Sequence, residues 1–292
     1  MEKSFKNYVI LILLAIIWGS SFILIKRGLE VYSHTQVAAL RLLIASISLV
    51  PFVFIALKKV KKKHWLPLFV SGVFGNGFPA FLFTKAQTQL DSGFTGIVNS
   101  LTPLFTLLLG VFFFALKPNK TNILGILIGF IGAVYLTVSH WNIEIVINNY
   151  VFYIVLATLF YAISINVIKR YLGELDAIHI SALAFLFVGP PMVIYIFNTD
   201  LIILTQSSAG FEALIYIIIL AVLGTSAAVV LFNYLLKQSS TIFASSVTYL
   251  IPIVAIAWGK FDGENILLQH LIGTTIILVG VYLVNKKKPT LK

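Results

Sequence analysis

The sequence predicts an all-α integral membrane protein with ten transmembrane helices, on the basis of three observations. First, 59% of the 292 residues are hydrophobic and only 11% are charged, which is too apolar for a soluble protein of this length. Second, ten charge-poor apolar segments approach the ~20 residues that a helix needs to cross ~30 Å of hydrocarbon. Third, glycines and prolines recur at a nearly constant spacing, which indicates two copies of a five-helix unit.

Each predicted helix is an apolar segment that ends at a basic or polar stretch. In the first half these are residues 8–25, 37–57, 66–84, 93–116 and 123–138. In the second half they are residues 150–168, 178–197, 214–236, 242–259 and 266–284. The first segment lacks a small-residue cleavage pattern, so we interpret it as a span and not as a signal peptide. The longest gaps, 139–149 and 198–213, are too short for a soluble enzymatic domain, so we expect the chain not to be an enzyme.

The repeat is defined by five ordered pairs of residues. They are Gly75 with Gly224, Pro103 with Pro252 and Gly110 with Gly259, each 149 residues apart, then Gly125 with Gly273 and Gly132 with Gly280, each 148 apart. A single pair would arise by chance in any chain of ten apolar helices, but five in order would not. We therefore predict a first repeat over residues 1–139, a second over 150–285 and a basic tail over 286–292.

Five helices leave the chain on the opposite side of the membrane, so the second repeat must be inverted. Inverted repeats are typical of secondary transporters, which expose a midplane site alternately to the two sides. The basic residues agree with this topology, because sixteen of them fall on the side of a cytoplasmic N-terminus. They are Lys3, Lys6, Lys58, Lys59, Lys61, Lys62, Lys63, Lys117, Lys120, Lys169, Arg170, Lys237, Lys286, Lys287, Lys288 and Lys292. Both termini are thus predicted to be cytoplasmic, in a multi-pass protein of the inner cell membrane.

The net charge of +11 is explained by this insertion pattern, so we expect no nucleic-acid partner. The lysine run from Lys58 to Lys63 either binds anionic lipid headgroups, at ~1 kcal/mol per cation, or only fixes the topology. The absence of cysteine excludes disulfides and thiolate sites. The five histidines lie at span ends and far apart in sequence, so neither a metal site nor a cofactor is expected.

Several motifs together resemble one family. They are Trp18-Gly19-Ser20-Ser21-Phe22, Arg41-Leu42-Leu43-Ile44-Ala45, the Pro103 and Pro252 segments, the Gly125/Gly132 and Gly273/Gly280 pairs, and Asp262-Gly263-Glu264. In this order they resemble the EamA-type ten-helix carriers of the drug/metabolite transporter superfamily. The resemblance implies export or exchange of small metabolites, amino acids or drugs through a central cavity lined by the first, third, fourth, sixth, eighth and ninth helices. The sequence departs from the family at residues 115–117 and 161–164.

Polar residues follow one face of the fourth predicted helix, at Thr95, Asn99, Thr102 and Thr106. Pro103 lacks a backbone donor and so frees a carbonyl near midspan. Ser245, Thr248 and Pro252 repeat this arrangement in the ninth helix. These faces either offer hydrogen bonds to a substrate or join helices at ~0.6 kcal/mol per contact.

Other polar and aromatic residues lie deep in apolar sequence and are candidates for the same cavity. The complete set of predicted cavity residues is Trp18, Ser21, Asn76, Asn99, Thr102, Asn166, Asn233, Tyr234, Thr248 and Tyr249. Bridging between helices is the alternative role for the amides, and simple packing is the alternative for Trp18. The Gly125-x3-Gly129 motif, with Gly273 and Gly280, is expected to allow close helix packing.

Arg41 is the only charge well inside a span and is therefore a functional candidate. Because the family's cavity excludes the second helix, we assign Arg41, with Pro103 and Pro252, to gating or helix breaking instead of substrate contact. The ten acidic residues avoid the middle of every span, which disfavours coupling to protons or sodium. The predicted function is uncoupled export or exchange of small metabolites, with amino acids preferred, and the alternative is a flippase for a lipid-linked intermediate.

Overall fold

A computed structural model describes residues 2–90, 92–138, 149–261 and 268–285, and this part of the chain contains helices and no strands. The first half forms α1 (Glu2–Leu29), α2 (His34–Leu57), η1 (Lys62–His64), α3 (Trp65–Gly72), η2 (Val73–Gly77), α4 (Phe78–Ala86), α5 (Ser92–Val98), η3 (Asn99–Leu101), α6 (Thr102–Phe113) and α7 (Lys120–Val138). The second half forms α8 (Tyr150–Tyr171), α9 (Ala177–Phe197), α10 (Leu201–Leu204), α11 (Ser208–Ala221), η4 (Val222–Ala227), α12 (Ala228–Gln238), α13 (Thr241–Ser245), α14 (Val247–Phe261) and α15 (Leu268–Asn285).

All ten predicted segments contain helix. Seven helical stretches among the described residues are long and apolar enough to cross a bilayer, and residues 120–135, 241–254 and 272–284 form shorter apolar helices. The predicted end of the fourth segment was wrong, because α6 stops at Phe113. Ala115 has a φ of 54°, a left-handed conformation that no α-helix contains, and it turns the chain toward α7.

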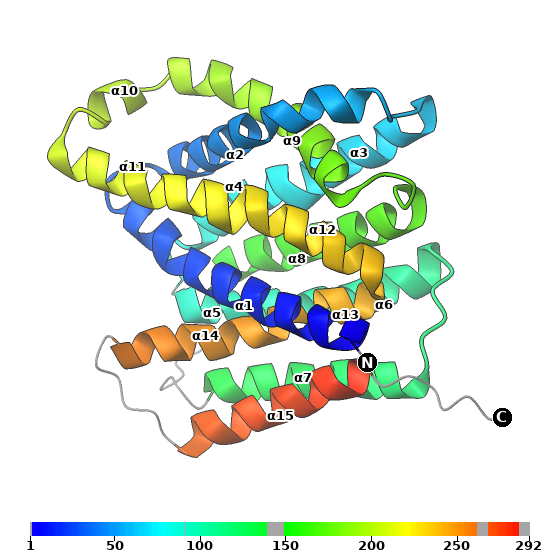
Figure 1. Ribbon diagram of the computed structural model, residues 1–292. Coiled ribbons are helices and arrows are strands. Elements are labelled where there is room, and N and C mark those ends of the chain that lie inside the picture. Colours follow the sequence, from blue (N-terminus) through cyan, green and yellow to red (C-terminus); the bar gives the residue numbers. More distant parts are fainter. Residues whose placement is uncertain (1, 91, 139–148, 262–267, 286–292) are drawn as a thin grey trace.

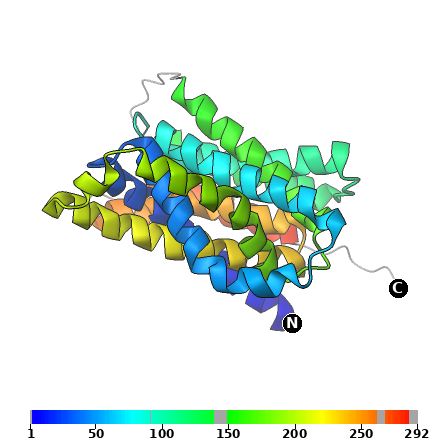
Figure 2. The same cartoon turned by 90° about the horizontal axis from the view of Figure 1, so that it is seen from above.

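The helices run roughly along one direction, and α1 begins at the same end of the bundle where α15 finishes (Figure 1). Figure 2 shows the same bundle from above. At one edge α7 packs along α15, and α2 packs along α9 on the other side. A Cβ added at Gly125 would lie 2.8 Å from the carbonyl oxygen of Gly280, which confirms that glycines bring α7 and α15 close together.

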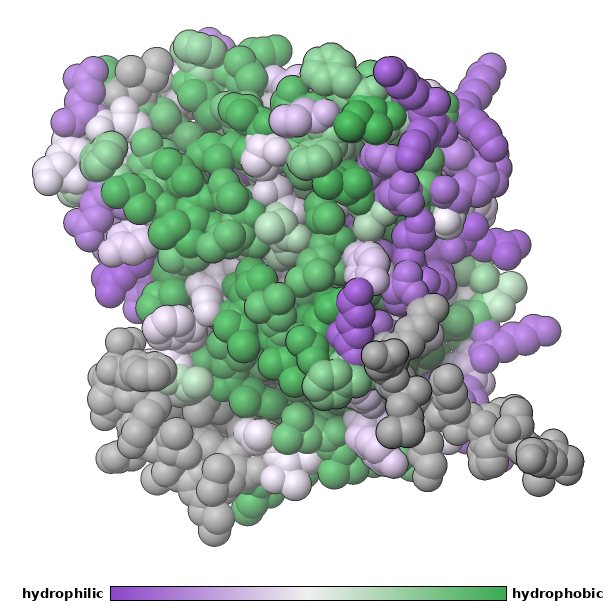
Figure 3. Space-filling view, viewed as in Figure 1, coloured by the Kyte–Doolittle hydropathy of each residue, from purple (hydrophilic) through white to green (hydrophobic). Residues whose placement is uncertain are grey.

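The surface of the bundle suits a lipid environment around its middle. Hydrophobic residues form a broad band there, and hydrophilic residues gather toward the two ends of the helices (Figure 3). Large apolar side chains are fully outside the core, with Phe112 76% and Phe197 72% exposed. Because exposed apolar surface of this extent is unfavourable in water, the fold is that of a protein embedded in a membrane.

Two helices contain a π-helical turn at matching positions of the two halves. These turns are η2 and η4, which begin 149 residues apart, at Val73 and Val222. A π-turn inserts one extra residue and shifts the rotation of the helix beyond it, and such turns are frequent at functional sites. Each contains a glycine packed on a serine of the other half, Gly75 on Ser164 and Gly224 on Ser21.

One end of the bundle, which we call the basic end, carries the α2–α3, α6–α7, α8–α9 and α12–α13 connections (Figure 1). Here Lys59 pairs with Asp176 at 3.4 Å, and both Lys61 and Lys63 pair with Glu174. Hydrogen bonds from Lys63 and Lys61 lower the pKa of Glu174 to about 2, although all three side chains are half exposed. The lysine run is thus tied to the α8–α9 connection, whereas its binding to lipid headgroups stays a prediction.

Candidate functional site

A cavity of about 110 Å³ lies between the two halves of the chain. One water molecule needs ~10–15 Å³ of such a volume, so the cavity has room for several water molecules or a small solute. Its wall includes residues from each of the six helices that the resemblance implied: α1, the α3–η2–α4 helix, the α5–η3–α6 helix, α8, the η4–α12 helix and the α13–α14 helix. Arg41 of α2 also lines it, which the sequence analysis did not expect.

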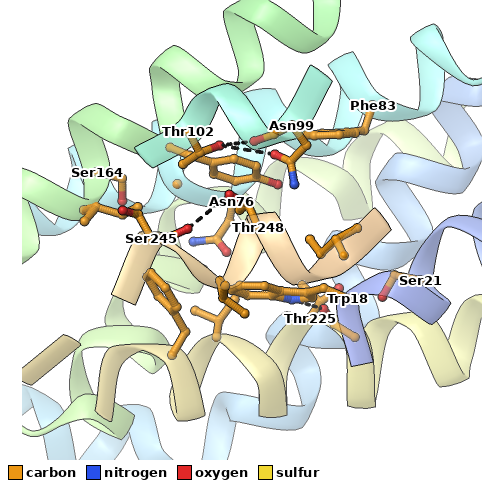
Figure 4. A pocket seen from close by; sticks show the side chains of 18 of the residues that line it. Trp18, Ser21, Asn76, Phe83, Asn99, Thr102, Ser164, Thr225, Ser245 and Thr248 are labelled. Carbon is orange, nitrogen blue, oxygen red and sulfur yellow. Dashed lines mark hydrogen bonds between the residues drawn. The ribbon is translucent and has the colours of Figure 1, made fainter. Parts of the chain in front are cut away.

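The polar residues of the wall come from facing helices. Asn76 and Asn99 from the first half and Thr248 from the second point toward one space, with Trp18 across from them (Figure 4). All but Trp18 are at most 9% exposed. The rest of the wall is largely apolar or aromatic and includes Phe22, Ile25, Phe83, Ile165, Ile168, Val229, Phe232 and Ile251. Such a wall favours a small ligand that carries a few polar groups on an apolar body.

Each of the two prolines leaves the carbonyl four residues before it without its usual helical partner, and each of these carbonyls accepts from a hydroxyl. Pro252 lies inside α14 and Pro103 at the beginning of α6, and a gating role for either stays a prediction. At Pro103 the carbonyl is that of Asn99, which accepts from both the backbone N–H and the hydroxyl of Thr102, the latter at 2.8 Å. Pro252 frees the carbonyl of Thr248, and the Ser100 hydroxyl donates to it at 3.1 Å. The sequence analysis did not single out Ser100. The signal for such a residue is a proline, because the carbonyl four positions before it needs a donor from elsewhere. Neither proline itself lines the cavity.

Trp18 is held in place by the π-turn of the other half. Its Nε1 donates to the carbonyl oxygen of Gly224 at 3.1 Å, and its ring packs against Phe232 with centroids 5.3 Å apart. Ser21, one helical turn further along α1, donates to the Ile17 carbonyl at 2.9 Å and lines the same cavity. Trp18 thus has a structural contact and a cavity-facing surface at once.

Two asparagines of the wall have an amide oxygen with no partner in the described chain. Nδ2 of Asn233 donates to the Ser181 hydroxyl at 2.9 Å, and that hydroxyl already donates to the Ala177 carbonyl. Ser181 can therefore only accept, which fixes the Asn233 amide and leaves its Oδ1 unpaired. Asn76 likewise donates through Nδ2 to the Ser71 carbonyl at 3.2 Å, so its Oδ1 remains an open acceptor.

Among the residues that the structure describes, Arg41 has a hydrogen-bond partner at one atom. Its Nε donates to Oγ1 of Thr225 at 2.7 Å, and the Thr225 hydroxyl donates to the Leu220 carbonyl at 2.9 Å. Thr225 lies in the π-turn η4, directly after Gly224. The second helix therefore does reach the cavity through this long side chain, which corrects its expected exclusion from the lining.

Three predicted cavity residues do not line the cavity. Asn166 instead joins α8 to α6, because its Nδ2 donates to the Thr106 carbonyl at 3.1 Å. The hydroxyl of Tyr249 donates to the Ile126 carbonyl at 2.9 Å, so Tyr249 joins α14 to α7. The ring centroid of Tyr234 lies 5.2 Å from Nζ of Lys6, near the beginning of α1. These side chains leave their helices on faces turned away from the cavity, which spacing within a uniformly apolar sequence did not reveal.

No acidic residue of the described part of the chain lines the cavity, and no group of three potential metal ligands occurs there. Five acids have partners elsewhere: Glu30 pairs with Arg27, Asp200 accepts from Gln36, Glu212 accepts from Tyr216, and Glu174 and Asp176 bind lysines. The described site is thus a mostly apolar chamber with amides, hydroxyls and one guanidinium, which can bind a solute.

Residues 6–138 and again residues 148–286 match the model of the EamA-like transporter family. The chain belongs to this family. The sequence of this EamA-like transporter is 27% identical to that of an uncharacterised transporter of Archaeoglobus fulgidus, over 97% of this chain and 100% of that protein. It is 26% identical to the uncharacterised inner membrane transporter YedA of Escherichia coli K12, over 94% of this chain and 89% of YedA.

A third relative, from Salmonella typhimurium, is described as a probable amino-acid metabolite efflux pump and is 24% identical over 95% of this chain and 94% of that protein. A protein of known crystal structure shares the fold of this EamA-like transporter with a TM-score of 0.72, at 13% identity over 96% of each chain. The family and the fold confirm the resemblance to the drug/metabolite transporters and identify the chain as a multi-pass membrane transporter.

Proposed function

We propose that this EamA-like transporter exports or exchanges small metabolites, with amino acids as its substrates, by alternating access through the central cavity. In this proposal ten transmembrane helices form two inverted five-helix repeats in the inner cell membrane, with both termini cytoplasmic. The observation that carries the proposal is that helices of both halves build one cavity and meet there through matched contacts, Gly75 with Ser164 and Gly224 with Ser21. Matched contacts allow the two halves to exchange conformations, as alternating access requires.

The chemistry of the wall supports an amino acid as the substrate. The open amide oxygen of Asn76 can accept from an ammonium group, and the apolar wall suits an aliphatic or aromatic side chain. The name of the Salmonella relative points to the same class of solute.

We also propose that the lysine run at 58–63 binds anionic lipid headgroups. The run contains five lysines, and three of them contact the carboxylates of Glu174 and Asp176, so positive charge is left in excess.

Transport is proposed to be uncoupled from ion gradients. A proton relay inside a membrane normally uses a buried carboxylate, and none of the described cavity residues is acidic. We therefore expect flux to be unchanged when an ionophore collapses a proton gradient. A strong dependence of flux on that gradient would contradict uncoupled transport.

The direct test is counterflow in liposomes that contain the purified protein. The liposomes are preloaded with a mixed amino-acid pool, and entry of labelled leucine and phenylalanine is followed without any ion gradient. Saturable entry is the expected result. If the folded protein admits no amino acid but accelerates the transbilayer movement of a lipid-linked probe, the chain is a flippase and the proposal is wrong.

A further inference from the structure

We propose that Arg41 binds the carboxylate of the transported solute and thereby restricts the cavity to carboxylate-bearing substrates. This inference rests on the proposed transport function and names its substrate class. It gives Arg41 a role in direct substrate contact, although the resemblance places the second helix outside the cavity lining.

Arg41 has more hydrogen-bond donors than the described chain uses. A guanidinium has five N–H donors, and the described chain provides a partner only for Nε, on Oγ1 of Thr225. Its two terminal nitrogens, with four donors, have no acceptor among the described residues, while part of the side chain remains exposed to the cavity. These two nitrogens form the fork that matches a carboxylate in a bidentate pair.

The charge of Arg41 has no counter-charge in the described cavity wall. Arg41 is the only charged residue in the described cavity wall. Its hydrogen-bond partner among the described residues, Thr225, is neutral. Five acids bind other residues, and the remaining ones lie outside the predicted spans. A cation inside a membrane protein is costly without a counter-ion, and such residues mark substrate or ion pathways. The missing counter-charge therefore comes from the solute.

The π-turn η4 holds the guanidinium of Arg41 in position. The anchor Thr225 belongs to the π-turn η4 and follows Gly224, whose carbonyl accepts from Trp18. Thr225 can only accept from Arg41, because its own hydrogen goes to the Leu220 carbonyl. One rigid turn thus orients both the guanidinium and the indole, so that a bound carboxylate lies beside an apolar surface. A solute with one carboxylate, a small apolar body and an ammonium group for the open amide oxygen of Asn76 fits this wall.

The test uses ligand-induced thermal stabilisation of the full-length protein in detergent. The probes are L-leucine, L-leucinamide, 4-methyl-2-oxopentanoate and inorganic phosphate, which separate the carboxylate from the ammonium and from other anions. The variants are Arg41→Gln, Arg41→Lys and Thr225→Val. Arg27→Gln is the matched control, because Arg27 pairs with Glu30 outside the cavity.

We expect leucine and the oxo acid to act at concentrations at least about 30-fold below leucinamide, the ratio that corresponds to one partner of a buried charge pair. Arg41→Gln should abolish this preference, Arg41→Lys and Thr225→Val should weaken it, and Arg27→Gln should retain it. Equal potency of leucinamide, stabilisation by phosphate alone, or an unchanged preference in Arg41→Gln would overturn the inference. If Arg41→Gln does not fold, an unchanged preference in both Arg41→Lys and Thr225→Val overturns it.

Counterflow separates the failure of this inference from the failure of the proposed function. Saturable counterflow in which amino-acid amides compete as well as the acids leaves transport standing and removes the role of Arg41. Stabilisation by carboxylates without any counterflow supports the Arg41 site and contradicts transport.

Discussion

Gly224 of the π-turn η4 packs directly on the hydroxyl of Ser21 in α1, so closely that a Cβ added at Gly224 would lie 2.6 Å from Oγ of Ser21. The Cβ of Ser21 is further away, at 3.7 Å, which is ordinary van der Waals contact. The hydroxyl oxygen alone therefore sets the closeness of this contact between the two halves.

Gly224→Ala should lower the stability of the protein by about 1–3 kcal/mol, because the new methyl group overlaps Oγ of Ser21. Adding Ser21→Ala removes the overlapping oxygen, so the double variant should recover most of the loss. The measurement is a double-mutant cycle of thermal stability in detergent. Additive effects of the two substitutions would contradict the contact.

The matched pair in the other half should respond differently. A Cβ at Gly75 would meet both the Oγ of Ser164 and its Cβ, the latter at 3.0 Å. Ser164→Ala should therefore rescue Gly75→Ala only in part, and the comparison of the two cycles tests the geometry of each π-turn.

Ser100→Ala should destabilise the protein by about 1–2 kcal/mol. It leaves the Thr248 carbonyl, which Pro252 deprives of its helical partner, without the hydroxyl that now donates to it. Replacing Pro252 by alanine restores a backbone donor, so Ser100→Ala should cost less in that background. Equal losses in both backgrounds, measured by thermal unfolding, would show that the Ser100 bond does not compensate for the proline.

Tyr249→Phe should lower stability by about 0.5–1.5 kcal/mol without altering the apparent affinity for substrate. Its hydroxyl binds the Ile126 carbonyl, and its ring packs on Gly129, so it holds α14 to α7 outside the cavity. Thermal unfolding and the KM for counterflow measure the two effects separately. A changed KM with unchanged stability would return Tyr249 to the substrate site.

Glu174→Gln tests the ion pairs of the basic end through pH. Because Lys63 and Lys61 lower the pKa of Glu174 from 4.5 to about 2, its stabilising effect is complete above pH 4.5 and is lost as the pH falls toward 2. The wild type should melt slightly above Glu174→Gln between pH 5 and 8, and the difference should shrink between pH 4.5 and 2. High salt should also reduce the difference, since these side chains are half exposed. A difference that grows on acidification would contradict these pairs.

The sequence predicted where the apolar helices lie along the chain, because composition and repeat spacing depend on the chain alone. It also located Asn76, Asn99 and Thr248, whose polarity is conspicuous in apolar helices. The π-turns at η2 and η4 were not predictable, because an extra residue in one turn leaves no pattern in the sequence. These turns change which faces of the following helices meet the cavity.

Rotation about the helix axis explains the remaining errors. Asn166 and Tyr249 lie as deep in apolar sequence as Asn233, but their donors reach backbone carbonyls of neighbouring helices. Arg41 was expected away from the cavity because the family's cavity excludes the second helix. Its side chain is long enough to reach Thr225, and side-chain reach is not readable from helix order.

The central claim is that one cavity between the two halves opens alternately to the two sides, and cysteine accessibility tests it most directly. The chain contains no cysteine, so single cysteines can replace Ile25 and Ser245, cavity residues of α1 and α13, in an otherwise unreactive protein. Each is labelled in proteoliposomes of known orientation by a membrane-impermeant thiol reagent, with and without an amino-acid substrate. The account predicts that Ile25→Cys reacts from one side and Ser245→Cys from the other, and that substrate shifts the two rates in opposite directions. Labelling of both from the same side, or rates that rise and fall together, would contradict alternating access.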